Sequence, residues 1–244
     1  LGLVFSFTRA AWVSLVVVAA IYAAMRFGFK LKTLVGIGVI MLALVWTSKD
    51  AIIIELQRNK QDSSDNLTEH VESISNVSSD DSNLERLNRW SCAIALFKER
   101  PITGWGPGTY QFVYAPFQKS DLKTIISTNN ADGGNAHSEY LGPLAEQGVL
   151  GALFMILLIW WASKIGFRLW RNIKNLDDRN LAVSVYLGLM SYFIHGVLNN
   201  YLDTDKANAP FWGFLVLLVV LDIELKQRND SRSLKSATQQ SRIV

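Results

Sequence analysis

Five stretches of this chain lack charged side chains for long enough to cross, or nearly cross, a lipid bilayer. They occupy residues 10–25, 33–48, 147–163, 180–202 and 207–221. A membrane-spanning helix needs about 20 apolar residues, so the shorter stretches require interfacial residues or snorkelling Lys and Arg side chains at their ends. Buried helices of a large soluble core are the alternative, but the charge pattern between the stretches argues against it. We therefore predict an all-α polytopic membrane protein with about five transmembrane helices.

Every second connection between the apolar stretches is rich in Lys and Arg, and this pattern predicts the orientation of the helices in the membrane. They are concentrated in three segments: 26–32, 164–179 and 226–242. The connection at 203–206 holds a single Lys. Because short cytoplasmic loops are enriched in Lys and Arg, the three basic segments are expected in the cytoplasm. Arg9, the long segment 49–146 and the 203–206 turn are then expected on the opposite side of the membrane.

The pattern divides the chain into four parts. They are two helices within 1–48, an outer loop domain at 49–136, three helices within 137–225, and a cytoplasmic tail at 226–244 that is expected to be disordered. Residues 62–83 are rich in Ser, Asn and Asp and indicate a flexible linker inside the loop domain. The loop domain is therefore expected to be only partly helical.

An amphipathic helix is predicted at 83–100 in the loop domain. A capping-box signature, Ser-Asn-Leu-Glu at 82–85, marks its start. Arg86 and Arg89 are three residues apart and are expected to lie together beside an apolar stripe. The stripe recurs at helical spacing and consists of Leu84, Leu87, Trp90, Ile94 and Phe97. Such a helix would lie on the membrane surface or against the helix bundle.

His137 precedes the third apolar stretch, at the predicted outer boundary of the membrane. An imidazole there can accept a proton at neutral pH, although a capping or interfacial histidine is the simpler interpretation. Glu139 and Glu146 follow on the same segment. Glu146 is so close to the apolar stretch that its charge should face the bundle interior, a hydrated cavity or the membrane boundary.

Three arginines fall on the predicted outer side: Arg9, Arg86 and Arg89. Arg9 begins the first helix, where both the helix dipole and the bias of cations toward the cytoplasm disfavour a positive charge. Guanidinium groups bind phosphate oxygens in bidentate fashion. With His137, the arginines therefore suggest a site for a lipid phosphate or diphosphate, and contact with lipid headgroups without catalysis is the alternative.

Other patterns narrow the function further. The glycines within 101–110 are not followed by Lys and Ser or Thr, so they do not form a phosphate-binding P-loop. A net charge of +3 is too small and too scattered to indicate nucleic-acid binding. The single cysteine, Cys92, allows neither a disulfide framework nor a cysteine-rich metal site. No metal site is predicted.

Three motifs of the chain resemble one known family. They are Thr-Arg-Ala-Ala-Trp at 8–12, the run from Arg89 to Tyr110 with its Pro-Ile-Thr-Gly-Trp-Gly turn, and His137-Ser138 followed by Gly148-Val-Leu-Gly151. Together they are similar to the O-antigen ligase and O-antigen polymerase (Wzy-type) superfamily of bacteria. The resemblance covers residues 5 to about 165 and matches the C-terminal half of family members. Val13 stands where ligases often have Leu, which leaves ligase and polymerase both open.

The resemblance implies a GT-C-like, metal-independent and inverting glycosyltransferase of the bacterial inner membrane, without a cofactor. Its site would face the periplasm, its donor would be a glycan on undecaprenyl diphosphate, and its acceptor a glycan, lipid A core or a protein hydroxyl. His137, Arg86 and Arg89 are the expected catalytic residues, and Arg9 is expected to bind the diphosphate with both arginines. The expected supporting residues are Ser138, Glu139, Gly148 and Gly151.

Several functions remain open. An O-antigen or exopolysaccharide polymerase and a protein O-oligosaccharyltransferase belong to the same superfamily and use the same chemistry. A polysaccharide transporter component would need polar side chains at mid-depth in the helices, and His195 is the only obvious one. A sensor or scaffold would use the loop domain for binding without needing the arginines and His137.

Overall fold

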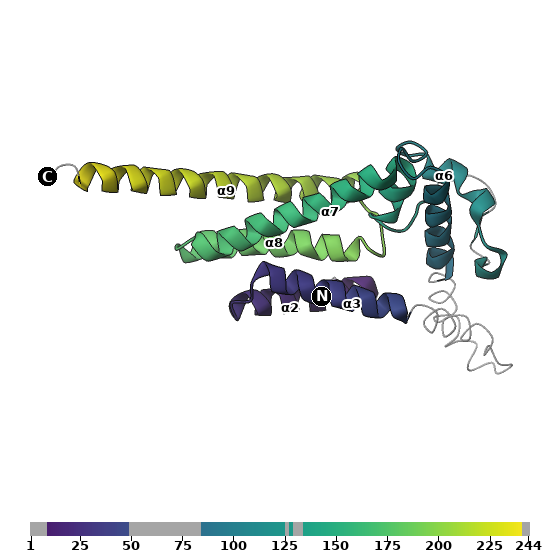
Figure 1. Ribbon diagram of the computed structural model, residues 1–244, viewed down its shortest axis with the longest axis horizontal. Coiled ribbons are helices and arrows are strands. Elements are labelled where there is room, and N and C mark those ends of the chain that lie inside the picture. Colours follow the sequence, from purple (N-terminus) through teal and green to yellow (C-terminus); the bar gives the residue numbers. More distant parts are fainter. Residues whose placement is uncertain (1–8, 49–83, 125–126, 129–133, 241–244) are drawn as a thin grey trace. The chain divides into compact units, whose positions relative to one another are not determined.

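The computed structural model describes residues 9–48, 84–124, 127–128 and 134–240, and within these ranges every regular element is helical (Figure 1). The chain forms two compact units. The first comprises Leu1–Leu31, Ile156–His195 and Tyr201–Val244. The second comprises Lys32–Met155 and Gly196–Asn200. The predicted all-α fold is therefore confirmed for the described part of the chain.

The first unit is a helix bundle. α2 (Arg9–Arg26) packs against α8 (Leu176–His195), and α8 packs against α9 (Asp205–Gln240). The C-terminal part of α7 (Leu141–Asn172) joins them, and a side chain at Gly166 would come within 2.4 Å of the Tyr186 ring of α8. A small residue on one helix thus allows close packing of an aromatic ring from the next.

A buried ion pair connects α7 with α9 in this unit. Arg168 donates two hydrogen bonds of 2.6 Å to the carboxylate of Asp222, one from Nε and one from Nη2. Lys226 lies 3.0 Å from the same carboxylate. Asp222 is buried, whereas the Arg168 side chain is 41 % exposed. The carboxylate is therefore neutralised by two cations that both reach solvent.

Among the described residues, two helices are long and apolar enough to cross a membrane. They are α7 and the Lys206–Ser231 part of α9, while Ala11–Arg26 and Leu31–Met41 form shorter apolar helices. Large apolar side chains on these helices are exposed, including Val16, Val39, Leu150, Phe154 and Val216. Such exposure fits contact with lipid. The number of five spans, and the side of the membrane on which the loop domain lies, remain predictions.

The C-terminal tail differs from the sequence prediction. Disorder is expected from residue 226 onward, but α9 continues as a helix to Gln240. Two ion pairs at helical i, i+4 spacing support this extension, Asp222 with Lys226 at 3.0 Å and Glu224 with Arg228 at 3.4 Å. The expected disorder is therefore wrong for 226–240, and residues 241–244 lie outside the described part.

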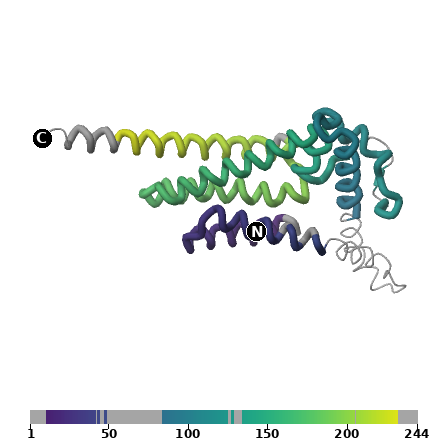
Figure 2. The backbone as a smooth tube through the Cα atoms, in the orientation of Figure 1, coloured from purple at the N-terminus to yellow at the C-terminus, as the bar shows by residue number. Residues whose placement is uncertain are grey.

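The second unit surrounds a small core where the loop domain meets the start of α7. It contains most of α3 (Leu31–Thr47), a helix over 84–99, α6 (Tyr110–Val113), η1 (Ala115–Phe117) and η2 (Ser120–Leu122). Figure 2 draws the backbone as a tube whose colour follows the sequence. The buried core residues are Cys92, Ala93, Leu96, Tyr110, Tyr114, Ala136 and Ala145. The linker expected at 62–83 lies outside the described residues.

The 84–99 helix matches the predicted element, and it buries several polar positions together with Leu84 of the expected stripe. Its buried positions include the polar Glu85, Asn88 and Arg89, whereas Ile94 of the expected apolar stripe is exposed. Asn88 donates to the Gln118 side chain at 3.1 Å and accepts from the backbone of residue 119 at 3.1 Å. The polar face is therefore buried because partners about 30 residues later satisfy its hydrogen bonds. The capping-box Ser at position 82 lies outside the described residues.

Candidate functional site

The 101–110 turn docks onto a kink in α7. Gly148 interrupts the helix with φ 66° and ψ −156°, and a side chain there would come within 2.4 Å of the Ile102 carbonyl oxygen. Gly104 has φ +64°, and its Cβ would lie 2.3 Å from the Glu146 backbone. The backbone N–H of Val149 donates to the Pro101 carbonyl at 2.8 Å. Gly148 thus supports the site by allowing this close contact.

Glu146 fixes the same turn through its carboxylate. One oxygen accepts from the backbone N–H of Gly108 and the other from that of Tyr110, both at 2.9 Å. The carboxylate therefore caps the start of α6. This contact was not predicted, because the sequence places Glu146 only by its distance from the apolar stretch. Gly151 follows in α7, where a side chain would come 2.7 Å from the Pro143 carbonyl oxygen.

Arg89 is buried and held on several sides. Its Nε donates to Oε1 of Glu85 at 2.6 Å, and both side chains are about nine-tenths buried, at 7 % and 6 % exposure. Its guanidinium carbon lies 4.0 Å from the centroid of the Tyr114 ring. Its carbonyl accepts a 2.8 Å bond from the hydroxyl of Tyr110. Arg86, one turn earlier on the same helix, is only half-buried.

His137 lies in a tight turn before α7 and adopts φ 46°, which non-glycine residues rarely do. Its backbone N–H donates to Oδ1 of Asn135 at 3.1 Å, and its carbonyl accepts from Nε1 of Trp90 at 3.3 Å. The second bond fixes the turn against the 84–99 helix. A residue whose backbone is held in such a conformation is characteristic of functional sites.

Burial lowers the pKa of His137 below its usual 6.5, and the guanidinium groups of Arg86 and Arg89 lower it further. The carboxylate of Glu85 acts in the opposite direction. The imidazole is therefore neutral at pH 7 and able to accept a proton. The structure thus brings together three of the predicted site residues, His137, Arg86 and Arg89.

Ser138 and Glu139 fix the start of α7. Oγ of Ser138 accepts from the backbone N–H groups of Tyr140 and Leu141, at 3.3 and 3.4 Å. The backbone N–H of Glu139 donates to the Gly196 carbonyl at 2.8 Å, and its side chain is buried. Both residues therefore hold the segment that carries His137.

Arg9 begins α2, which belongs to the first unit. Its side chain lies outside the described part of the structure. Its predicted place beside a diphosphate therefore remains a prediction.

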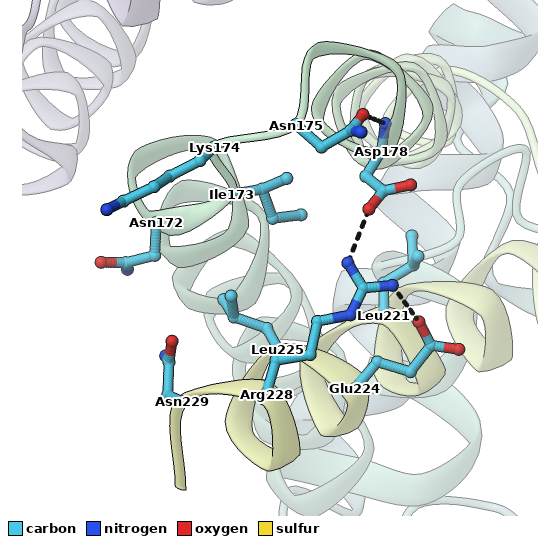
Figure 3. Close-up of a pocket in the computed structure, with 10 residues that line it drawn as sticks. All are labelled: Asn172, Ile173, Lys174, Asn175, Asp178, Leu221, Glu224, Leu225, Arg228 and Asn229. Atoms are coloured by element: carbon cyan, nitrogen blue, oxygen red, sulfur yellow. Dashed lines mark hydrogen bonds and ion pairs between the residues drawn. The ribbon is translucent and has the colours of Figure 1, made fainter. Parts of the chain in front are cut away.

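A pocket in the first unit has none of the predicted site residues in its lining. It is lined by the α7–α8 connection and α9, and Figure 3 shows Arg228 reaching across it. Arg228 binds Asp178 at 2.7 Å and Glu224 at 3.4 Å. Because two carboxylates already neutralise this arginine, the pocket offers little attraction for a phosphate.

The two helices long and apolar enough to cross a membrane, within the described residues, are consistent with a helical membrane protein. The chain belongs to the O-antigen ligase family, whose model matches residues 1–156. The match covers α2, α3, the cluster and the kink of α7, and it confirms the resemblance found in the sequence. No curated protein and no solved structure matches the chain.

Proposed function

We propose that this protein transfers a glycan from undecaprenyl diphosphate to an acceptor hydroxyl, as an O-antigen ligase does. The observation that supports this proposal best is the neutral imidazole of His137 beside two guanidinium groups. Membership of the O-antigen ligase family supplies the class of reaction. The site would face the periplasm of a bacterial inner membrane, where lipid-linked glycans are presented.

The proposed step is a single displacement with inversion. The acceptor oxygen attacks the anomeric carbon of the donor while its proton passes to the imidazole of His137. The bond between that carbon and the diphosphate oxygen breaks, and the electron pair leaves with the diphosphate. Arg86 and Arg89 stabilise the negative charge that develops there, and no step requires a metal ion. Arg9 is proposed to add a third contact to the diphosphate.

The two arginines differ in what they can do. Arg89 is nine-tenths buried and already bound to Glu85, whereas Arg86 is half-buried. Arg86 is therefore the better placed to contact phosphate oxygens directly. Arg89 acts on the diphosphate through its charge and without direct contact. Its side chain is shielded from water, and an electrostatic interaction is stronger there than at the surface.

Replacing His137 with Ala tests the proposal. Loss of a general base is expected to lower the transfer rate about 100-fold or more, while the protein still inserts in the membrane. The matched control is His70→Ala, because the sequence places that histidine in the polar linker. Glycan transfer by the His137→Ala protein at the parental rate would contradict the proposed role.

The acceptor is decided by a second experiment. Lipopolysaccharide from a strain lacking this protein is separated by electrophoresis. Loss of all long-chain bands with intact lipid-linked polymer indicates a ligase. A lipid A core that carries only one repeat indicates a polymerase. Unchanged lipopolysaccharide indicates a protein acceptor.

A further inference from the structure

Glu85 is a buried carboxylate that has no role in the proposed reaction and that binds Arg89, one of its catalytic arginines. One oxygen accepts a 2.6 Å bond from Nε of Arg89, and the other accepts from Oγ of Ser127. Oγ of Ser127 in turn accepts from the backbone N–H of Thr124 at 3.0 Å. The carboxylate therefore connects the 84–99 helix to the segment that follows η2.

The guanidinium group of Arg89 is confined on two further sides. It lies over the ring of Tyr114, whose hydroxyl is 2.6 Å from Oγ1 of Thr128. A side chain at Gly134 would come within 1.7 Å of Nη1 of Arg89, so it would have to displace the guanidinium group from this position. With Nε bound to Glu85, the guanidinium group is held in one orientation.

We infer that Glu85 is a positioning residue of the transfer site, which fixes Arg89 and places one negative charge against two positive charges beside His137. This inference rests on the proposed function, because it takes His137 as the proton acceptor. Arg86 then contacts the diphosphate, and Arg89 acts through the electrostatic field of the site. Glu85 keeps that field from becoming so positive that the imidazole is too weak a base.

Three charged groups act on the imidazole of His137 within the described residues. Arg86 and Arg89 lower its pKa, and Glu85 raises it. Neutralising Glu85 leaves both guanidinium groups unopposed, so the pKa falls further. A Gln side chain has the same size, can accept from Nε of Arg89 and can donate to Ser127. Glu85→Gln therefore removes the charge while it keeps the contacts.

The direct test is a histidine titration of the purified protein in lipid nanodiscs, followed by NMR of labelled imidazole carbons. The chain has three histidines, and a His137→Ala sample assigns the relevant signal. Glu85→Gln is expected to lower the pKa of His137. Glu99→Gln, an exposed carboxylate on the same helix, is expected to leave it unchanged. An unchanged pKa in the Glu85→Gln protein overturns the inference.

Rates give an independent readout, with undecaprenyl-diphosphate-linked glycan extracted from a strain lacking this protein as the donor. Glu85→Gln is expected to reduce kcat about 10- to 100-fold with little change in KM, because Arg86 still meets the donor. Glu85→Asp should recover part of the loss. Ser127→Ala removes one bond to the carboxylate and should reduce kcat in the same direction but less.

The two proposals fail in different ways. Parental kcat in both Glu85→Gln and Ser127→Ala overturns the positioning role, even if His137→Ala is inactive. Transfer by His137→Ala at the parental rate overturns the proposed function instead, whatever the titration of the Glu85→Gln protein shows.

Discussion

Two buried carboxylates of this protein are each paired with an arginine, but in different surroundings. Asp222 of α9 binds Arg168 of α7 in the first unit and has Lys226 as a second cation. Glu85 binds Arg89 four residues along the same helix in the second unit. The Arg168 side chain is 41 % exposed, whereas that of Arg89 is 7 % exposed.

The exposure of the arginine decides whether an ion pair only holds helices together or also changes the pKa of a neighbouring side chain. Arg168 reaches solvent, so water screens its charge and the pair mainly holds two helices together. Arg89 is shielded from water, so its charge extends to neighbouring groups and lowers the pKa of His137. A buried ion pair thus becomes part of a site when a titratable side chain shares its desolvated surroundings.

Breaking the buried pair of the second unit should have the largest effect on stability. Arg89→Met leaves Glu85 buried without its cation, which is expected to cost about 3–5 kcal/mol of unfolding free energy. Cys92 provides the measurement, because it is fully buried in this unit and burial raises its pKa to about 11. Alkylation of its thiol should become much faster in the Arg89→Met protein.

A double variant shows whether the loss comes from the unpaired charge. Glu85→Leu combined with Arg89→Met removes both charges, so much of the lost stability should return, because apolar replacement of a whole pair is often close to neutral. Glycan transfer should stay low. If Arg89→Met alone leaves the alkylation rate at the parental value, the two pairs do not differ as described.

Glu146 of the second unit binds backbone N–H groups and no arginine in the contacts described above. Removing its carboxylate should therefore lower the free energy of unfolding by less than Arg89→Met does. Glu146→Ala removes the acceptor from the N–H groups of Gly108 and Tyr110, and the first of these is exposed to water. The expected cost is about 1–2 kcal/mol, as for loss of a helix cap. Cys92 alkylation measures it, with Glu99→Ala as the control. A cost equal to that of Arg89→Met would show that burial of charge is not the deciding factor.

The sequence predicts the helices well because their apolar and charge patterns are local. It also singles out His137 and Arg89 through motifs and Arg86 through its helical spacing from Arg89, and the structure brings these three together. It does not predict the roles of Glu85 and Glu146. The i, i+4 spacing of Glu85 and Arg89 is a visible signal.

What the sequence lacks is information on distant partners. The bonds of Glu85 to Ser127 and of Asn88 to Gln118 join residues 42 and 30 positions apart. Burial of the polar Glu85, Asn88 and Arg89 was not predicted for the same reason, because buried polar side chains are favourable only once their partners are in place.

The pair of the first unit should tolerate loss of its arginine. Arg168→Met leaves Asp222 with Lys226 at 3.0 Å, and the exposed end of the pair is hydrated. The expected cost is below about 1 kcal/mol. Thermal loss of helical circular dichroism in detergent measures it, and Asp222→Leu with Arg168→Met serves as the apolar comparison. A cost comparable with that of Arg89→Met would remove the distinction between the two pairs.

The smallest expected effect concerns the electrostatic balance at His137. Arg86 lowers the pKa of the imidazole, so Arg86→Gln should raise it toward the usual value. Since the base must be neutral, the transfer rate rises with pH through this pKa. The acidic limb of the pH–rate profile should therefore shift to higher pH in the variant. The profile is measured at a saturating donor concentration, because the variant is expected to bind the donor more weakly. Lys98→Gln, an exposed cation on the same helix, should leave the limb in place. An unshifted limb would mean that Arg86 does not act on His137, and the buried Arg89 would then be the only guanidinium group that lowers its pKa.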